Sequence, residues 1–330
     1  MRRRGSRLIK EVVNAFITMS STSVLASWSP ASITNSGVTL DWAVSNGVTI
    51  TKTTIDDPTF DFSANTGTAD ILVENVEGLT ILNCISLNIN ELHIKYATNL
   101  VKLICYYNQL ITLDVSENTE LTDLLCDFNP LETLDVSKNT KLTELKFGTS
   151  NISEIDISSN IYLKWISFYE TPMTAIDTSA NVELLWLTCH KNLLTSLNIN
   201  TNTKLTYLRC DENQLTILDL NNNTLLDKIL CMSNQLTVLN ISNNVELEEL
   251  WCQLNDITEL DISLNTKLIK LVCQDNNHSP LITDNLYIDL DTNGLSNGVL
   301  SCTNNRTSAS DTARANLITK GWTISDNYTN

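Results

Sequence analysis

The sequence predicts a mainly β solenoid, built from stacked turns of 21 residues. Residues 79–267 repeat one 21-residue unit nine times without insertion or deletion, and a truncated tenth copy begins at Leu268. Each copy follows the frame L-x-x-L-x-C-x-x-N-x-L-x-x-L-D-V-S-x-N-T-x, most clearly at residues 121–141. A unit this short cannot bury its apolar side chains alone, so successive units must stack on one another.

The leucine spacing resembles that of leucine-rich-repeat proteins, of the internalin-like type and of the type found in Bacteroidetes surface or phage-borne proteins. The resemblance covers more than half of the chain and rests on a fixed repeat period. It implies a solenoid with one strand per turn on its concave side, which is usually the binding surface. The C-terminal phrases LDTNGLSNGVLSCTNN and ASDTARANLITKGWTI resemble segments of leucine-rich-repeat and structural proteins of Bacteroidetes and their phages.

Each part of the unit has an expected conformation. Alternation within L-x-x-L-x-C directs the second Leu and the Cys inward, and their neighbours outward. The later L-x-x-L-D-V part is expected to form a second short strand on the opposite side, with its Val or Ile inward. The narrow turn leaves little room for an α-helix, so we expect helices only in the C-terminal cap.

Two regions precede the repeats. Residues 1–27 are expected to be a basic leader, either signal-like, with Val24-Leu25-Ala26 before a cleavage point, or flexible and followed by a true start at Met19. Residues 28–78 are expected to form a small β module that covers the first repeat. Alternating apolar residues on both sides of Asn46-Gly47 predict a hairpin there, and Phe60, Phe62, Ile71 and Val73 suggest further strands.

The solenoid is expected to span residues 79–276, and residues 277–330 to form a C-terminal α/β cap. A cap is needed because an open solenoid end exposes apolar side chains and unpaired strand edges. We expect helices at 284–290 and 310–320, the second with Ser308 or Ser310 as N-cap and Gly321 as its stop. Strands are expected at 299–302 and 322–324.

One column of the repeat is filled by cysteine. Phe147 and Phe168 replace cysteine in two copies, which indicates an apolar core position. We therefore favour buried free thiols, although a spacing of about 4.8 Å between stacked residues also permits a few disulfides. A metal site is disfavoured because its ligands converge from several directions. The column comprises Cys84, Cys105, Cys126, Cys189, Cys210, Cys231, Cys252 and Cys273.

Three polar columns are expected to be structural. Asparagine fills one column from Asn118 to Asn265 without exception, and another from Asn108 to Asn276 with Ser150 and Thr171 as substitutes. Their amides can satisfy backbone groups buried by the turns. The aspartates of D-x-S-x-N are expected to accept hydrogen bonds from the following turn, with cation binding as the alternative. Glutamate and lysine before successive repeats are expected to pair across turns.

Composition and motifs exclude several functions. There are 21 Lys plus Arg against 38 Asp plus Glu, a net charge of −17, which argues against nucleic-acid and anionic membrane partners. No apolar run is long enough for a transmembrane helix, and no phosphate or dinucleotide motif is present. The three histidines lie in no zinc-binding spacing. We therefore expect a non-enzymatic protein without cofactors, extracellular or on a cell surface, or alternatively in a virion.

A single phrase resembles a metal site. Asp289, Asp291, Asn293 and Gly294 match the opening of a calcium-binding loop, but Leu300 stands where the loop requires its bidentate glutamate. A helix-to-strand turn explains the same residues through the left-handed conformations that Asn and Gly adopt.

The outward positions of the concave strands form the candidate binding surface. Trp165, Trp186 and Tyr207 share one column in consecutive repeats, so their rings are expected to be exposed and to stack. Packing between strands explains scattered aromatic residues, whereas an exposed apolar strip favours recognition. We expect a protein or glycan ligand; the alternative is a structural virion component, a decoration or fibre protein with the solenoid as spacer. The candidate site residues are Tyr106, Phe128, Trp165, Tyr169, Trp186, His190, Tyr207, Arg209 and Trp251.

Overall fold

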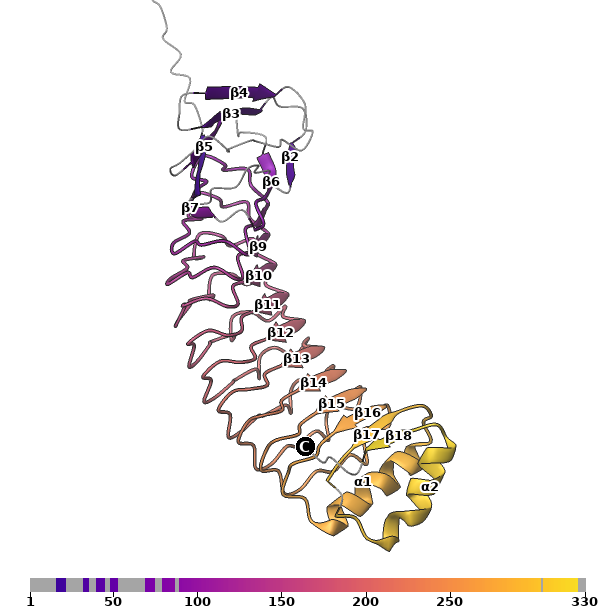
Figure 1. Ribbon diagram of the computed structural model, residues 1–330. Helices are drawn as coiled ribbons and strands as arrows, with labels where there is room; N and C mark the ends of the chain where they lie inside the picture. Colours follow the sequence, from indigo (N-terminus) through magenta and orange to yellow (C-terminus); the bar gives the residue numbers. More distant parts are fainter. Residues whose placement is uncertain are drawn as a thin grey trace, which may run out of the picture.

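The computed structural model describes residues 79–86, 89–303 and 305–325, and the backbone of five earlier strands (Figure 1). These strands are β1 (Phe16–Ser21), β2 (Ser32–Asn35), β3 (Leu40–Val44), β4 (Val48–Lys52) and β5 (Ala69–Glu74). They belong to two sheets. A five-stranded sheet has the order β4-β3-β5-β1-β7, and a thirteen-stranded sheet runs from β18 through β6 to β2.

The thirteen-stranded sheet is the predicted solenoid. Apart from β2, its strands are parallel, and Leu103, Leu124 and Leu145 are successive register partners, one repeat apart. The strands lie along the inner side of a curved rod (Figure 1). They are β6 (Leu79–Asn83), β8 (Lys102–Ile104), β9 (Asp123–Leu125), β10 (Glu144–Lys146), β11 (Trp165–Ser167), β12 (Trp186–Thr188), β13 (Tyr207–Arg209), β14 (Lys228–Leu230), β15 (Glu249–Trp251) and β16 (Lys270–Val272), followed by β17 and β18 in the cap.

The N-terminal strands confirm part of the sequence prediction. The hairpin forms, since β3 and β4 are antiparallel with Val44 opposite Val48; its turn residues lie outside the described part. The predicted strand at Ile71 and Val73 is β5, whereas Phe60 and Phe62 lie outside the described residues. Within the segment 1–27, which we expected to be a leader, β1 pairs with β5 and β7. Strand β2 pairs antiparallel with β6 and so extends the first edge of the solenoid sheet.

The expected second row of strands does not form in the described turns. The L-x-x-L-D-V part is a strand only in the first copy, as β7 (Ile89–His93), which belongs to the five-stranded sheet. Elsewhere it contributes a single β-bridge, between Val238 and Glu259. Neighbouring turns share isolated backbone hydrogen bonds there, such as Glu132 N to Ile111 O at 3.1 Å, which are too few for a ladder.

Buried asparagines join the turns instead. The Asn139 side-chain Nδ2 donates to the carbonyls of Val115 and Asn118 in the preceding turn, both at 2.9 Å. In the other column, Asn129 Nδ2 donates to Cys105 O at 2.9 Å, and its Oδ1 accepts from Leu110 N at 3.1 Å. Both patterns recur along the solenoid. The prediction that these columns are structural is therefore confirmed.

The first asparagine column leaves buried acceptors without partners. Seven of its side-chain oxygens have no hydrogen-bond partner: those of Asn118, Asn139, Asn160, Asn181, Asn223, Asn244 and Asn265. Asn202 is the exception, because Thr178 stands where other turns have Val, Ile or Leu, and its hydroxyl donates to Asn202 Oδ1 at 2.8 Å. One hydroxyl at this core position thus satisfies the amide of the next turn.

This contact predicts an unusual tolerance of threonine in the core. Val136→Thr should place a hydroxyl beside Asn160 Oδ1 and leave the free energy of unfolding within about 1 kcal/mol of wild type. By contrast, a buried hydroxyl without a partner costs about 1–3 kcal/mol. Thr178→Val should destabilise by about 1 kcal/mol. Urea unfolding measures both; a loss of more than about 2 kcal/mol in Val136→Thr would contradict the proposed bond.

The cysteine column is a row of buried free thiols, as predicted. All nine cysteines of the chain are free and buried, and Cys126 Sγ approaches Lys146 O in the next turn at 3.2 Å. Burial raises the pKa of Cys84 and of Cys231 to about 12, so these thiols stay protonated. Where phenylalanine replaces cysteine, the rings of Phe147 and Phe168 stack at 5.4 Å.

We expect cysteine substitutions to act through packing alone. Cys210→Ala should destabilise by opening a cavity. Cys210→Val should be milder than Cys210→Asp by several kcal/mol, because a buried carboxylate without a partner is costly. Calorimetry with and without a reductant provides the control, since the wild-type melting temperature should not change. A large drop with reductant would show disulfides instead.

The aspartate and glutamate–lysine columns also have their expected roles. In four of these turns the serine two residues after the aspartate donates from its hydroxyl and amide. These bonds lower the pKa of Asp114, Asp156, Asp177 and Asp261. On the surface, Lys141 pairs with Glu120 at 2.5 Å and Lys204 with Glu183 at 2.6 Å; Lys267 and Glu246 also pair. Such exposed pairs contribute little stability but favour the correct register.

Each turn also contains one residue in the left-handed conformation. This residue lies two positions after the cysteine column, with φ between 51° at Thr149 and 58° at Tyr107 and Leu254. None of these residues is glycine. For L-residues, and above all β-branched ones, the conformation is strained by about 1–2 kcal/mol.

Thr149→Gly should therefore stabilise the protein. We expect a gain of about 0.5–1 kcal/mol in the free energy of unfolding, because relieved strain exceeds the added entropy of the unfolded chain. Thr133→Gly, at an exposed position of ordinary φ, is the matched control and should lose about 0.5–1 kcal/mol. Chemical unfolding of the two variants should give opposite signs; equal losses would contradict the strain.

The C-terminal cap contains the described helices. Helix α1 (Pro280–Asn293) is longer than the predicted 284–290, because Ser279 caps it and Gly294, with φ of 76°, ends it. Helix α2 (Asp311–Thr319) ends before Gly321, as predicted. The strands β17 (Val299–Ser301) and β18 (Thr323–Ser325) continue the solenoid sheet. Among the described residues, no helix has the length and hydropathy to cross a membrane.

Ser310, one of the two predicted N-cap residues, is the N-cap of α2, but its side chain has another partner. Ser310 makes no side-chain capping bond to that helix; its Oγ donates to Asp284 Oδ1 at 2.5 Å. Thr307 caps the preceding short 3-10 helix (Ser308–Ser310) and also donates to Asp284, at 2.5 Å from its hydroxyl. The buried carboxylate of α1 takes both hydroxyls and so fixes the start of α2.

Candidate functional site

Three rows of outward side chains line the concave face. The first row is the first residue of each short strand, the floor is the last residue of each strand, and the second row lies two residues beyond. Side chains alternate along each segment, and the central residue of each strand β8–β16 is buried, so the residues of these three rows point outward. In the turns from β10 to β13, the first row is Glu144, Trp165, Trp186, Tyr207; the floor is Lys146, Ser167, Thr188, Arg209; and the second row is Gly148, Tyr169, His190, Asp211.

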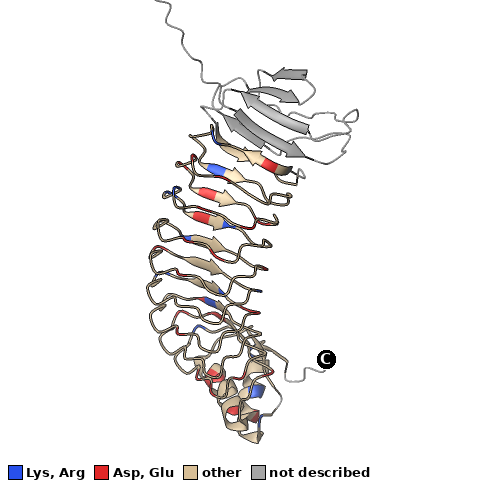
Figure 2. Ribbon diagram, turned by 90° about the vertical axis from the view of Figure 1, so that its left-hand side faces the viewer, with Lys and Arg blue, Asp and Glu red and all other residues tan. Residues whose placement is uncertain are grey.

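The first row is aromatic at its centre and charged at both ends. Lys102 pairs with Asp123 at 3.2 Å before the aromatic residues, and Lys228 with Glu249 at 3.0 Å after them. Acidic and basic residues are interspersed along the strands (Figure 2). The aromatic segment is thus bounded by ion pairs across strands rather than by charge of one sign.

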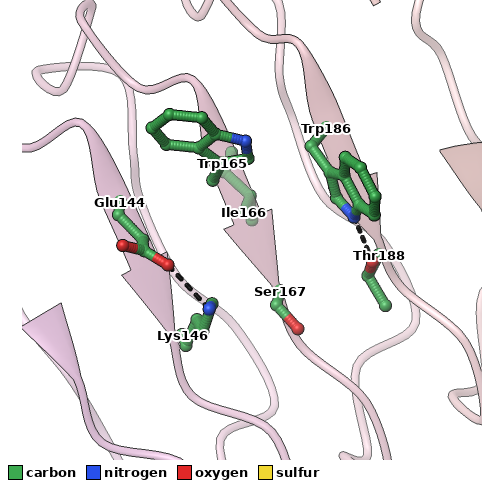
Figure 3. A pocket seen from close by; sticks show the side chains of 7 residues that line it. All are labelled: Glu144, Lys146, Trp165, Ile166, Ser167, Trp186 and Thr188. Atoms are coloured by element: carbon green, nitrogen blue, oxygen red, sulfur yellow. Dashed lines mark hydrogen bonds and ion pairs between the residues drawn. The ribbon is translucent and has the colours of Figure 1, made fainter. Parts of the chain in front are cut away.

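The expected aromatic stack is only partly formed. Trp186 stacks on Tyr207, with ring centroids 3.7 Å apart and planes 13° from parallel. Trp165 does not stack on Trp186, although the two are register partners; a pocket lies beside both rings (Figure 3). Both tryptophans are 41% exposed. Alternation predicted their exposure correctly, but the ring orientations depend on neighbouring side chains.

The pocket beside the tryptophans has both apolar and polar walls. Its volume is about 450 Å³, within the range of small-ligand sites. Glu144 and Lys146 form an ion pair at 2.6 Å on one side. On the other side, Trp186 Nε1 donates to Thr188 Oγ1 at 3.2 Å, and the Ser167 hydroxyl lies between the two sides (Figure 3).

A chain of aromatic rings borders the second row. Tyr107 stacks on Phe128 at 4.1 Å, Phe128 meets Tyr169 edge-on at 5.9 Å, and Tyr169 stacks on His190 at 4.9 Å. Tyr169 reaches Phe128 across the intervening turn because that turn has Gly148: a Cβ there would lie 2.4 Å from the tyrosine ring.

Gly148 is a site residue that the sequence analysis missed. It is the only glycine between residues 79 and 279. This isolation is the sequence signal that could have identified it. Its φ is not positive, so no turn requires glycine there. Its role is to leave room for the ring of Tyr169.

A buried carboxylate lies at the start of the second row. Asp127 is 7% exposed, and its Oδ1 accepts from Gly148 N at 2.8 Å. Burial raises the pKa of Asp127 from its ordinary 3.8 to about 6. Burial, followed by the charge of Asp127, raises the pKa of Tyr169 to about 12. Burial also lowers the pKa of His190 to about 4, with Arg209 contributing, so His190 is neutral at pH 7.

Asp127 should therefore make stability depend on pH. A raised carboxyl pKa means that the folded state holds its proton more tightly, so stability is highest below pH 3.8 and falls as pH rises to about 6. Asp127→Asn keeps the acceptor for Gly148 and should stabilise at pH 7.5 by about 2–3 kcal/mol. Urea unfolding of wild type and Asp127→Asn between pH 4 and 7.5 measures this. The fall in stability with rising pH that Asp127 causes in the wild type should be absent in the variant.

Asp135→Asn is the matched control for this prediction. Asp135 is exposed, and hydrogen bonds from Ser137 lower the pKa of its carboxyl. The substitution should reduce stability slightly at pH 7.5, the opposite sign. A loss of stability in both variants would contradict the effect of burial at Asp127.

The remaining predicted residues are placed differently. Tyr106 contacts Tyr107 edge-on at 5.6 Å, so it joins the second-row chain. Arg209 pairs with the fully buried Asp211 at 2.8 Å. Trp251 lies two turns beyond Tyr207, where the ammonium of Lys270 lies 4.3 Å from its ring centroid. Trp251 is thus not brought together with the other aromatic residues.

The calcium-loop interpretation is wrong. Asp289, Asp291 and Asn293 belong to α1 rather than to a loop. Residues two apart on a helix do not share a face. Asp291 binds Lys320 Nζ at 2.6 Å, and no group of three or more metal-binding side chains occurs in the part of the chain that the structure describes.

The parallel sheet and its regular 21-residue turns form a leucine-rich-repeat solenoid. Solved structures similar to this chain include two proteins of Listeria monocytogenes. The functional domain of InlJ from Listeria monocytogenes, which includes a cysteine ladder, is 35% identical with a TM-score of 0.54, covering 62% of this chain. This chain spans 51% of that structure, about half its length.

More distant structures share the fold. The internalin InlF from Listeria monocytogenes is 19% identical with a TM-score of 0.53, and covers 77% of this chain and 88% of its own. The leucine-rich repeat domain of APL1B is 20% identical with a TM-score of 0.51, covering 77% and 89%. No protein-family model and no curated protein matches the sequence.

Proposed function

We propose that this chain is a non-catalytic recognition and adhesion protein that binds a protein or a glycan through its concave face. One observation carries the proposal: two tryptophans, each 41% exposed, lie beside an open pocket of about 450 Å³. Exposed apolar surface of this kind marks interaction sites, and tryptophan is enriched among the residues that dominate binding energy.

The chemistry of the described residues supports binding rather than catalysis. The cysteines are buried, and burial raises the pKa of their thiols, so they do not supply a nucleophile. His190 stacks on Tyr169 and feels the charges of Arg209 and Asp211. These groups stabilise the concave surface.

Charge and similarity support a protein that is secreted or displayed on a cell surface. Opposite charges are interspersed on the strands (Figure 2), and the net charge of −17 disfavours nucleic acid. The likeness to InlJ and InlF favours a surface or secreted protein over a virion component.

Trp186→Ala tests the proposal. It should weaken binding to a ligand-bearing cell-surface extract by about 2 kcal/mol or more, as removal of a central aromatic anchor does. The free energy of unfolding should change by no more than about 1 kcal/mol, because the ring lies outside the core. Surface-plasmon binding and circular dichroism measure the two effects.

Ile217→Ala is the control, since Ile217 is 74% exposed and lies away from the strands. It should alter neither binding nor folding. Equal binding by wild type and Trp186→Ala would show that the ligand does not bind to the concave face. A Trp186→Ala protein that does not fold would show that the rings serve packing.

A further inference from the structure

The pocket beside the tryptophans is a groove between the first row and the floor, and the second row lies beyond the floor. Residues of the two rows are four positions apart on one extended segment, which separates their Cα atoms by about 13 Å. Trp165 and Trp186 form the first-row side of the groove, and Tyr169 and His190 are the second-row residues of the same two turns. The floor between them carries the hydroxyls of Ser167 and Thr188. The two tryptophans thus border a polar floor.

The charges that border this groove are already neutralised. Lys146 is paired with Glu144 at 2.6 Å, and Arg209 with Asp211 at 2.8 Å. His190 adds no charge, because burial lowers its pKa to about 4. A strongly anionic or cationic ligand would have to break these pairs, whereas an uncharged ligand would leave them intact.

An extended peptide is a poor match for this surface. Peptides that add to a sheet use the main-chain groups of an open strand edge. Here β11, β12 and β13 are each paired on both sides, so their main-chain groups are taken. An apolar side chain over the floor would also cover the Ser167 hydroxyl and the Thr188 hydroxyl proton without giving either an acceptor, which is costly.

A sugar ring matches both parts of the pocket. A pyranose has a face of C–H groups that packs on an aromatic ring, and a rim of hydroxyls that both donate and accept hydrogen bonds. The Trp165 and Trp186 rings supply the apolar surfaces. Glu144 and Lys146 on one side, and the hydroxyls of Ser167 and Thr188, supply partners for the rim (Figure 3).

We infer that the groove binds an uncharged oligosaccharide, with one sugar ring held beside Trp165 and Trp186 and the adjoining sugars directed toward Tyr169. The inference rests on the proposed function of the concave face and specifies its ligand. Gly148 contributes indirectly, because its missing side chain lets the ring of Tyr169 lie in place against Phe128.

Titration of the full chain with uncharged oligosaccharides tests this. The probes are cellohexaose, chitohexaose, maltohexaose and mannohexaose, followed by tryptophan fluorescence and calorimetry. At least one should bind and change the emission. Trp165→Ala and Trp186→Ala should each weaken that binding roughly tenfold or more. Absence of binding by the whole panel, or binding that both variants retain, overturns the inference.

Further variants separate ring contacts from folding. Ser167→Val replaces a floor hydroxyl with methyl groups, and Gly148→Ala displaces Tyr169; both should weaken saccharide binding severalfold while melting curves stay near wild type. Trp251→Ala removes an aromatic ring three turns beyond Trp186 and should leave binding unchanged. Binding that falls in Trp251→Ala but not in Ser167→Val would overturn the assignment to this groove.

A chemical treatment distinguishes failure of the ligand from failure of the proposed function. Cell-surface extract is treated with periodate, which cleaves sugar diols, or with protease, and offered to wild type and Trp186→Ala. Binding that needs Trp186, is lost after periodate and survives protease supports the saccharide. Binding that needs Trp186, survives periodate and is lost after protease overturns the saccharide but keeps the concave face. Binding independent of Trp186 overturns both.

Discussion

The hydrogen bonds of the buried asparagine amides hold this solenoid together. Each strand has three residues in most turns, and the opposite side adds only isolated backbone bonds. The amide of Asn160 reaches the carbonyls of residues 24 and 21 positions earlier, and its counterparts do the same. Because these distances along the chain are fixed, an inserted residue would move an amide away from its acceptors. This explains why nine copies of the unit keep one length.

The concave face depends on this regular stacking. Rings in one row of adjacent turns are brought to the spacing of paired strands, about 4.8 Å, which lets Trp186 and Tyr207 stack. Of the two turns with phenylalanine in the cysteine column, the Phe168 turn also contributes Trp165 and Tyr169 to the concave face, and the Phe147 turn contributes Gly148. Changes in the core and on the binding surface therefore occur in the same turns.

Much of the architecture followed from residue columns. Exchange of cysteine with Phe147 identified a core position, and the unbroken asparagine column identified a structural one. Both conclusions needed only the pattern of side chains along a repeating backbone. Alternation likewise placed Trp165 and Trp186 on the surface.

What the columns did not predict depends on interactions between particular neighbours. The extent of α1 depends on the Ser279 cap, which the apolar pattern did not reveal, and this helix removes the calcium loop. Side-chain conformations decide that Trp165 does not stack on Trp186 and that the Tyr169 ring packs over Gly148. A single sequence fixes which rings share a face, but not which of them touch.

The asparagine bonds also have a direction along the chain. Each amide donates to carbonyls of the preceding turn, as Asn118 does to the first copy. The first copy has no earlier repeat to supply such carbonyls, and it carries Ala97 where the second copy has Asn118. During synthesis, each emerging turn would find its acceptors already in place on the turn before it. At roughly 5–20 residues per second, a ribosome would deliver one such turn every few seconds, in the order in which the hydrogen bonds must form. Growth of the solenoid thus has a polarity that matches translation.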